Sequence, residues 1–437
     1  MRTRLLPLGL AALFFNPVYA QTVDTGRSEV YALNARATRA AEPATPLTLA
    51  AALALARDAN SDLSAAGHEL AAVEATITQA QMRPNPELAA LMEDTRNATR
   101  TTTLQLNQAI ELGGKRAARI DAAERGRDVA SAELDAKRAE IRAGVIAAFF
   151  DVLVAQERLR LAEAAVTLAQ RASTAASRRV TAGKVSPVEE TKARVAEAGV
   201  RIELMQVGGE LANARKRLAG YWGNPFPRFE RAEGKLETLP PLPTLAELDA
   251  RLAASPNLQR AKIEVERRQA LAEIERSRGV PDMTVSLGAK RDEQLGRNQA
   301  IFGVSIPLPI FNRNQGNVLE ALRRTDKARD ELSLAETRLS NELSLAYGRL
   351  NSARLEVEAL QRDILPGAQS AYDAATKGFE LGKFSFLEVL DAQRTFFQAK
   401  SQYLRALAEA HRSAAEIERI LGEASPHSTP APAATQS

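Results

Sequence analysis

The sequence predicts a mainly helical fold built from two similar halves, each combining a pair of short strands with one very long helix. Alanine, leucine, arginine and glutamate dominate the 437 residues, and aromatic residues make up 5% of them, a composition typical of long helices. Sequence landmarks recur at an offset of about 195–200 residues, which indicates an internal duplication. Apolar residues of the longest helical stretches recur with the seven-residue period of coiled coils.

The duplication is visible in three pairs of segments. The stretch "ANSDLSAA" near Asn60 corresponds to "ASPNLQRA" near Pro256, and "PNPELAALMED" corresponds to "GVPDMTVSLGA". The stretch "AGKVSPVEETKARVA" at 182–196 corresponds to "LGKFSFLEVLDAQRT" at 381–395. Each half therefore has the same predicted order: a short helix, a second helix, two strands, a very long helix and a helix of intermediate length.

The N-terminus has the pattern of a signal peptide over residues 1–20. Arg2 and Arg4 precede an apolar run, and small residues end at Ala20, after which we expect cleavage. The apolar run of about 11 residues is too short to span a bilayer as a helix, and no later apolar run is long enough. The mature chain is therefore predicted to lack a transmembrane helix, and residence in a membrane would require a β-barrel.

Composition divides the remaining chain into five parts. Residues 21–45 are polar and alanine-rich, and we expect them to be flexible. The first repeat spans 46–221 and the second spans 245–422. They are joined by the proline- and glycine-rich linker 222–244, "WGNPFPRFERAEGKLETLPPLPT". Residues 423–437 are predicted to form a disordered tail.

The long helices are predicted at about 115–178 and about 313–377. At 1.5 Å per residue each would be about 95 Å long, several times the width of a globular domain. Their apolar residues alternate steps of four and three, as in a coiled-coil seam, and Pro366 is expected to kink the second helix. The first seam comprises Ile141, Val145, Ala148, Val152, Ala155, Leu159, Ala162, Val166 and Ala169, and the second comprises Leu339, Leu343, Ala346, Leu350, Ala353, Val357, Leu360 and Ile364.

Short strands are predicted at about 86–94 and 101–110 in the first half, and at about 281–291 and 299–308 in the second. Each strand has one apolar and one small or polar face, at about the length that crosses a bilayer at a tilt. The loops between paired strands, "TRNATR" and "RDEQLGRN", are polar. The predicted apolar faces are Leu88, Ala90 and Met92; Thr102, Leu104 and Leu106; Met283, Val285, Leu287 and Ala289; and Phe302, Val304, Ile306 and Leu308.

A hairpin placed between such long helices has no local partner to cover its edges. Half-buried hairpins of a soluble domain would show the same alternation. Four strands cannot close a lipid-facing barrel, because the smallest single-chain barrels use eight. Three copies of the chain would supply twelve strands, and symmetry would remove the edges.

Together these features resemble the TolC-like outer-membrane factor family, also described as outer membrane efflux proteins, over about residues 46–422. The segments "LNQAIELGGKRAAR" (106–119) and "VSIPLPIFNRNQGN" (304–317) are similar to that family's corners between strand and long helix. They are most similar to its branch for heavy-metal efflux, the cobalt–zinc–cadmium or CzcC-like group, and "YWGNPFP" at 221–227 also fits.

The resemblance implies a passive export duct rather than an enzyme. The family forms homotrimers in which a twelve-stranded β-barrel in outer-membrane lipid continues into a twelve-helix tube through the periplasm. Its partners are a periplasmic adaptor, or membrane fusion protein, and an inner-membrane pump of the resistance–nodulation–division (RND) class. This chain would then sit in the outer membrane of a Gram-negative bacterium and conduct divalent heavy-metal cations to the exterior.

Two turns, "GKVSPVE" (183–189) and "GKFSFLE" (382–388), resemble the periplasmic tips of this family, where adaptor hairpins dock. Each glycine would let the chain reverse, and each serine would cap the next helix. Glu189 and Glu388 would complete capping boxes, and capping alone would also explain these residues. The predicted docking residues are Gly183, Lys184, Ser186, Gly382, Lys383 and Ser385.

By the same resemblance, Glu388 and Asp391 match acids that line the closed periplasmic aperture. Three copies would form two acidic rings, and such rings attract cations. The first half differs, because Lys192 takes the place of Asp391. Solvated acids on an ordinary helix face are the alternative interpretation.

Other kinds of site are not indicated. The chain has no cysteine, and His68, His411 and His427 share no metal-ligand spacing, so no tight transition-metal site is expected. No phosphate-binding loop or nucleophile elbow indicates an enzyme, and no cofactor is predicted. A net charge of +4 with interleaved basic and acidic residues argues against a nucleic-acid patch.

Two other interpretations are open. The same duct could carry drugs or other small molecules, because the corner motifs indicate metals through resemblance alone. A soluble periplasmic coiled-coil scaffold or adaptor would retain the signal peptide and the heptads. That scaffold leaves unexplained why alternating strands occur at equivalent points of both halves.

Overall fold

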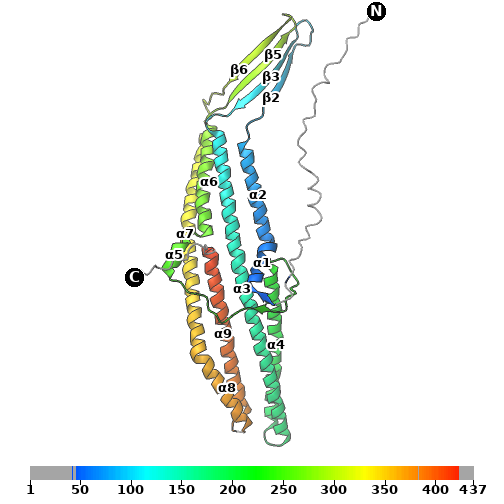
Figure 1. Cartoon of the computed structure of the whole chain (residues 1–437), viewed down its shortest axis with the longest axis vertical. Coiled ribbons are helices and arrows are strands. Elements are labelled where there is room, and N and C mark those ends of the chain that lie inside the picture. The colour runs from blue at the N-terminus through cyan, green and yellow to red at the C-terminus, as the bar shows by residue number, and fades with distance from the viewer. Residues whose placement is uncertain (1–41, 43–45, 382, 423–437) are drawn as a thin grey trace, which may run out of the picture. The chain divides into compact units, whose positions relative to one another are not determined.

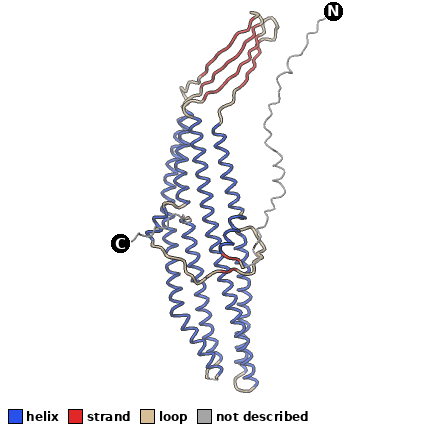
Figure 2. Tube along the Cα trace, in the orientation of Figure 1, coloured by secondary structure: helices blue, strands red, loops and turns tan. Residues whose placement is uncertain are grey.

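The computed structural model describes residues 42, 46–381 and 383–422. The predicted signal peptide, the segment 21–45 apart from Glu42, Gly382 and the predicted tail lie outside the described residues. The described chain is mainly helical, with a four-stranded sheet at one end of a layer of long helices (Figure 1, Figure 2).

Both halves have the predicted order of elements. The first contains α1 (Leu49–Ala59), α2 (Ser61–Gln81), β2 (Glu87–Glu93), β3 (Thr101–Ile110), α3 (Lys115–Thr181) and α4 (Pro187–Gly220). The second contains α5 (Leu245–Leu252), α6 (Pro256–Arg278), β5 (Met283–Asp292), β6 (Arg297–Ser305), α7 (Gln315–Ala359), α8 (Leu365–Glu380) and α9 (Phe386–Leu421). The short strands β1 (Leu47–Thr48) and β4 (Ala232–Glu233) pair in parallel and bring the first repeat against the linker.

The two long helices differ in continuity. α3 runs uninterrupted for 67 residues, a length of about 100 Å. In the second half α7 ends at Ala359, a π-helical turn covers Leu360–Ile364, and α8 follows. The helix predicted over 313–377, with a kink expected at Pro366, is thus interrupted by a π-turn at Leu360–Ile364, just before that proline. Proline lacks an amide hydrogen, and its ring would collide with the Arg362 carbonyl group in an α-helix.

The π-turn also changes the apolar seam. The buried residues follow the predicted heptad along α7 as far as Val357, and then at Leu360, the first residue of the π-turn. The next predicted seam residue, Ile364, is 47% exposed, and burial resumes at Ala368 and Ala375. The step from Leu360 to Ala368 is one residue longer than a heptad, and a π-turn accommodates one extra residue. In α3 the predicted seam is buried except for the half-buried Leu159 and Val166.

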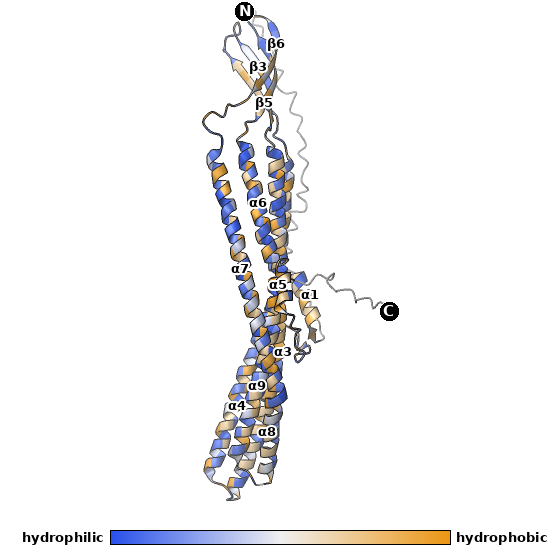
Figure 3. Cartoon of the chain, turned by 90° about the vertical axis from the view of Figure 1, so that its left-hand side faces the viewer, coloured by the Kyte–Doolittle hydropathy of each residue, from blue (hydrophilic) through white to orange (hydrophobic). Residues whose placement is uncertain are grey.

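The long helices lie side by side in one layer (Figure 1). Near the sheet, α3 packs between α2 and α6, and α6 packs against α7. Further away, α3 packs between α4 and α9, and α9 packs against α7 and α8. α2 and α4 therefore form one border of the layer, and α7 with α8 forms the other. Many residues of α6 and α7 are hydrophilic (Figure 3).

The sheet joins the two halves directly. Its strand order is β2-β3-β5-β6, and all neighbours are antiparallel. β3 pairs with β5 from Thr101↔Asp292 to Ile110↔Met283. β2 and β6 are the edge strands, and neither has an outer partner within the described residues.

The linker crosses the helix layer midway (Figure 1). The Gln156 side chain of α3 exchanges hydrogen bonds of 3.0 and 2.7 Å with the backbone of Ala232. The buried His411 ring of α9 stacks on Phe150, and its Nε2 lies 3.0 Å from the carbonyl oxygen of Leu236. We call α1, α5, the β1–β4 pair and the linker the collar.

Glu42, the first described residue, is hydrogen-bonded to the linker of the collar. Its carboxylate accepts hydrogen bonds from Trp222 Nε1 at 2.9 Å and Asn224 Nδ2 at 2.6 Å. The backbone amides of Arg228 and Phe229 donate to it at 2.5 and 3.0 Å. Trp222 and Asn224 are buried, so Glu42 satisfies donors that would otherwise be costly to bury.

Candidate functional site

The two faces of the sheet differ in chemistry. The strand register confirms that the predicted apolar residues of all four strands share one face, since Leu88 lies opposite Leu106, and the row continues to Leu287 and Phe302. On this face Leu88 is 71% exposed and Phe302 is 73% exposed. The other face carries Glu87, Gln105, Asn107, Ser286, Lys290 and Gln299. An open apolar surface of this kind indicates contact with lipid or another protein.

Two strand ends differ from the prediction. β6 ends at Ser305, so Ile306 and Leu308 lie outside the sheet, because Pro307 has no amide hydrogen for the ladder. β5 and β6 instead extend into the predicted polar loop, as far as Asp292 and Arg297. Gly296 allows the resulting tight turn with a φ of +63°.

The corner motifs hold the sheet to the helices. Gly113 and Gly114 have φ angles of +70° and +74°, and a Cβ atom on Gly113 would lie 2.6 Å from Val280 Cβ. Lys115 Nζ lies 2.7 Å from Asp282 Oδ1 of the other half. At the second corner, Asn314 Nδ2 donates to the Glu275 carbonyl oxygen at 2.7 Å. Both motifs therefore act structurally.

The first tip connects α3 to α4. Gly183 has a φ of +63°, as expected for the chain reversal. Ser186 caps α4 by accepting a hydrogen bond from the Val188 amide at 3.3 Å. The capping box predicted with Glu189 does not form, because the hydroxyl bonds the second amide of the helix instead of the third. Lys184 is exposed.

At the second tip the predicted capping box forms. Ser385 Oγ accepts from the Glu388 amide at 3.4 Å, and the Glu388 carboxylate accepts from the Ser385 amide at 2.6 Å. The Ser385 amide, followed by the Ser385 hydroxyl, lowers the pKa of the Glu388 carboxyl because both stabilise its charged form. Lys383 and Ser385 are exposed, and Gly382 lies outside the described residues.

Arg179 of α3 links the two tips. Its guanidinium carbon lies 4.5 Å from the centroid of the Phe379 ring of α8, and its Nη2 lies 3.5 Å from the Phe379 carbonyl oxygen. Ala176 and Ala193 are buried together nearby. No sequence pattern predicted this contact, because its partners are 200 positions apart in the chain.

The predicted aperture acids lie three residues apart on one helix. Glu388 and Asp391 are both exposed on α9. Within the residues that the structure describes, no group of three or more histidine, aspartate or glutamate side chains could hold a metal ion. His68 is exposed, His411 belongs to the collar contacts, and His427 lies outside the described residues.

Both borders of the helix layer carry exposed residues at heptad spacing. On α4, Val188, Val195 and Ile202 lie seven residues apart, and Val195 is 67% exposed. On α7, the exposed residues Leu334 and Leu355 share this spacing with intervening small or polar residues. Such a stripe ordinarily faces another helix. Within the described chain, no helix covers either stripe.

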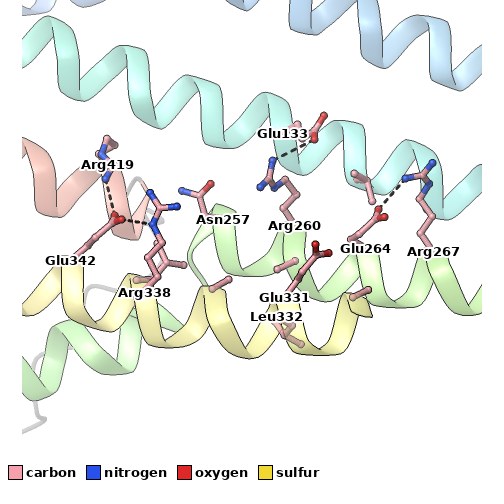
Figure 4. A pocket seen from close by; sticks show the side chains of 15 residues that line it. Glu133, Asn257, Arg260, Glu264, Arg267, Glu331, Leu332, Arg338, Glu342 and Arg419 are labelled. Carbon is pink, nitrogen blue, oxygen red and sulfur yellow. Dashed lines mark hydrogen bonds and ion pairs between the residues drawn. The ribbon is translucent and has the colours of Figure 1, made fainter. Parts of the chain in front are cut away.

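A cavity of about 580 Å³ opens between α3, α6, α7 and the end of α9 (Figure 4). We call it the Arg–Glu cavity, because its lining includes Glu133, Glu264, Glu331, Glu342, Arg260, Arg267, Arg338 and Arg419. Glu342 lies 2.8 Å from Arg338 Nε and 3.1 Å from Arg419 Nη2, and Arg338 is the main cause of its lowered pKa. Glu133 and Arg260 lie 3.5 Å apart. Sequence reasoning missed this cavity, because the interleaved charges indicated ordinary solvated helix faces.

Among the described residues, no helix is both long enough and apolar enough to cross a membrane.

Comparison with known proteins supports one family. The model of the family described as "Outer membrane efflux protein" matches residues 52–224 and 248–423. The chain is 51% identical over 423 residues to the cobalt-zinc-cadmium resistance protein CzcC of Cupriavidus metallidurans, covering 97% of this chain and 100% of that protein. It is 26% identical over 351 residues to the nickel and cobalt resistance protein CnrC of the same species, covering 79% of this chain and 78% of that protein.

Solved structures share the fold. The crystal structure of CusC has a TM-score of 0.73 at 19% identity and covers 86% of this chain and 92% of its own. The CmeC outer membrane channel of Campylobacter jejuni has a TM-score of 0.72 at 16% identity, covering 86% of this chain and 85% of its own. At these identities the likeness concerns the fold alone.

Proposed function

This chain belongs to the outer membrane efflux protein family, and on that premise we propose that three copies form a passive duct through the outer membrane. The observation that carries the proposal is the four-stranded sheet. Its apolar face is open, and its edge strands β2 and β6 have no outer partner within the described residues. Unpaired backbone groups at a sheet edge are costly in lipid, so another chain must cover both edges.

A single rotation axis that relates three copies of the chain can close both the sheet and the helix layer into rings. β2 lies above the border formed by α2 and α4, and β6 lies above the border formed by α7 and α8 (Figure 1). Pairing β6 of one copy with β2 of the next therefore brings the border formed by α7 and α8 toward the border formed by α2 and α4. Three copies give a twelve-stranded barrel above a twelve-helix tube.

We propose divalent heavy-metal cations as the cargo. The relatives CzcC and CnrC are named as resistance proteins for cobalt, zinc and cadmium and for nickel and cobalt. A duct needs no tight binding of its cargo, because conduction requires release.

The tips are proposed to dock a periplasmic adaptor that connects the duct to an inner-membrane RND pump. The proposed docking residues are exposed on both tips, as Lys184 and Ser186 on the first and Lys383 and Ser385 on the second. The contact of Arg179 with Phe379 holds these tips beside each other in one copy. Glu388 and Asp391 are proposed to line the aperture of the trimer and to favour cations.

Membrane fractionation tests the duct. We expect the mature protein in the detergent-extracted outer membrane, as a trimer by mass measurement. A deletion strain should become more sensitive to cobalt, zinc and cadmium salts than its complemented parent. A soluble periplasmic monomer would contradict the duct, whereas an outer-membrane trimer whose deletion leaves metal sensitivity unchanged would contradict the cargo alone.

A further inference from the structure

The Arg–Glu cavity and helix α1 of the collar lie on opposite sides of α3. On α3, Glu133 lines the Arg–Glu cavity, whereas Arg138 and Arg142 line a second cavity beside α1. At about 100° per residue, Arg138 lies about 140° from Glu133 around the helix axis, and Arg142 lies about 180° from it. The cavity therefore opens on the side of α3 that faces away from α1, which we call the free face.

In the proposed trimer the collar belongs on the outside. Twelve helices spaced about 10 Å apart form a ring about 38 Å across, which leaves an interior about 28 Å wide. Three collars, each with two helices and a linker, would fill that interior. The free face, with the Arg–Glu cavity, therefore lines the duct, an assignment that rests on the proposed function.

The acidic side chains of the cavity are balanced by basic ones. It contains as many arginines as glutamates, and the carboxylates of Glu133, Glu264 and Glu342 each lie within 3.5 Å of an arginine nitrogen of the same cavity. Figure 4 shows Arg338 and Arg419 approaching Glu342 from α7 and α9. Three copies place three such clusters around the interior. Without the arginines these clusters would be a ring of carboxylates, which attracts cations.

We propose that the arginines of this cavity, above all Arg338 and Arg419, mask the interior carboxylates so that divalent cations pass through the duct without being retained. The cations concerned are hydrated divalent ions, which a ring of free carboxylates would hold. Arg338 and Arg419 are thus specificity-determining residues of the interior, distinct from the aperture acids.

A purely structural role, in which an ion pair holds two helices together, does not explain the presence of Arg338. Its side chain is 76% exposed, and its partner Glu342 lies four residues on in the same helix. Exposed pairs at this spacing stabilise a helix by about 0.3–0.5 kcal/mol. Arg419 does join α9 to α7, so a purely structural role must be tested separately for that residue.

Planar-bilayer recordings of the purified trimer test the masking. With R338Q and R419Q combined, we expect cobalt or zinc chloride to reduce the potassium current more than in the wild type, and the reversal potential to shift toward cation selectivity. Adding Glu342→Gln to this pair should restore the wild-type response. The matched control is Arg138→Gln, which removes an arginine on the opposite face and should change neither quantity.

The outcomes separate the two proposals. A conducting trimer whose metal block and selectivity are unaffected by R338Q and R419Q would overturn the masking and leave the duct intact. A wild-type protein that forms no channel would contradict the duct itself. If the double variant fails to assemble, Arg338→Gln alone must show a smaller shift in the same direction, and its absence would also overturn the masking.

Discussion

The two repeats follow one order of elements but reach the tip of the layer differently. The first does so with a continuous α3, whose seam beyond Val152 is mostly alanine. The second uses α7, a π-turn and α8, and its seam contains large buried residues such as Leu343 and Leu350. Its tip also has the capping box and a stacked pair, Tyr372 and Phe396, with ring centroids 5.8 Å apart.

This difference shows that two copies of a duplicated helix can differ in length and still bury the same face. A seam tolerates one extra residue if a π-turn absorbs it, because the following helix then returns to the same face. In the second half the π-turn has this role, and Ala368 and Ala375 are buried again beyond it. α3 has no π-turn along its described length, so we expect its register to tolerate neither insertion nor deletion.

The largest expected effect comes from deleting one residue in each long helix. Deletion of the exposed Glu163 from α3 should rotate Ala169 and Ala176 about 100° away from their partners and unfold the first tip. Deletion of the exposed Asp363 together with Pro366→Ala should be tolerated, because the step from Leu360 to the next buried alanine becomes a regular heptad. Limited proteolysis detects unfolding of the tip in each deletion variant, and thermal unfolding monitored by circular dichroism gives the change in melting temperature.

Equal losses of melting temperature in the two deletion variants would contradict this account of the π-turn. The variant Pro366→Ala without a deletion is the matched control. It restores the amide donor but keeps the extra residue, so we expect the π-turn to persist.

Sequence reasoning succeeded where the determinant is periodic and local. It placed the strands and the common apolar face through Leu88 and Leu287, because alternation within each strand decides that face. It failed where the partner is remote, as for Arg179 with Phe379 and for the four hydrogen bonds that Glu42 accepts. Remote pairing depends on the packed layer, which no local pattern encodes.

The two tips show a second limit of prediction from sequence. The segments around Ser186 and Ser385 look equivalent, since both have a glutamate three residues later. Of these two tips, the one at Ser385 has the capping box and the one at Ser186 does not. Which amide the hydroxyl bonds depends on its rotamer and on the packing of the turn, neither of which the spacing determines.

An intermediate effect is expected from removing these caps. The double change Ser385→Ala with Glu388→Ala should destabilise the start of α9 by about 1 kcal/mol, because it removes both side-chain acceptors of the box, the hydroxyl and the carboxylate. Ser186→Ala should cost less, because it removes one hydrogen bond of 3.3 Å. Amide hydrogen exchange in the first turns of α9 and α4 measures the loss of stability in the two variants. A larger increase in exchange rate in the Ser186 variant than in the Ser385 double variant would contradict the prediction.

The smallest expected effect concerns pH. In each repeat, a basic side chain of the last helix donates a hydrogen bond to a backbone carbonyl group of the linker. Arg215 of α4 donates to the Glu230 carbonyl oxygen, and His411 of α9 donates to the Leu236 carbonyl oxygen. Histidine titrates near neutral pH and arginine does not. Burial lowers the pKa of His411 below 6.5, and the hydrogen bond to Leu236 opposes this shift more weakly.

Because the folded pKa of His411 lies below the unfolded value, the unfolded chain binds more protons, and stability falls as pH drops below 6.5 toward the folded pKa. We therefore expect a modest decrease in melting temperature from about pH 7 to about pH 5, the range in which histidine titrates. His411→Gln, which cannot titrate, should remove part of that decrease, whereas Arg215→Gln should leave its slope unchanged. An identical slope in the wild type and in His411→Gln would show that other groups account for the acid sensitivity.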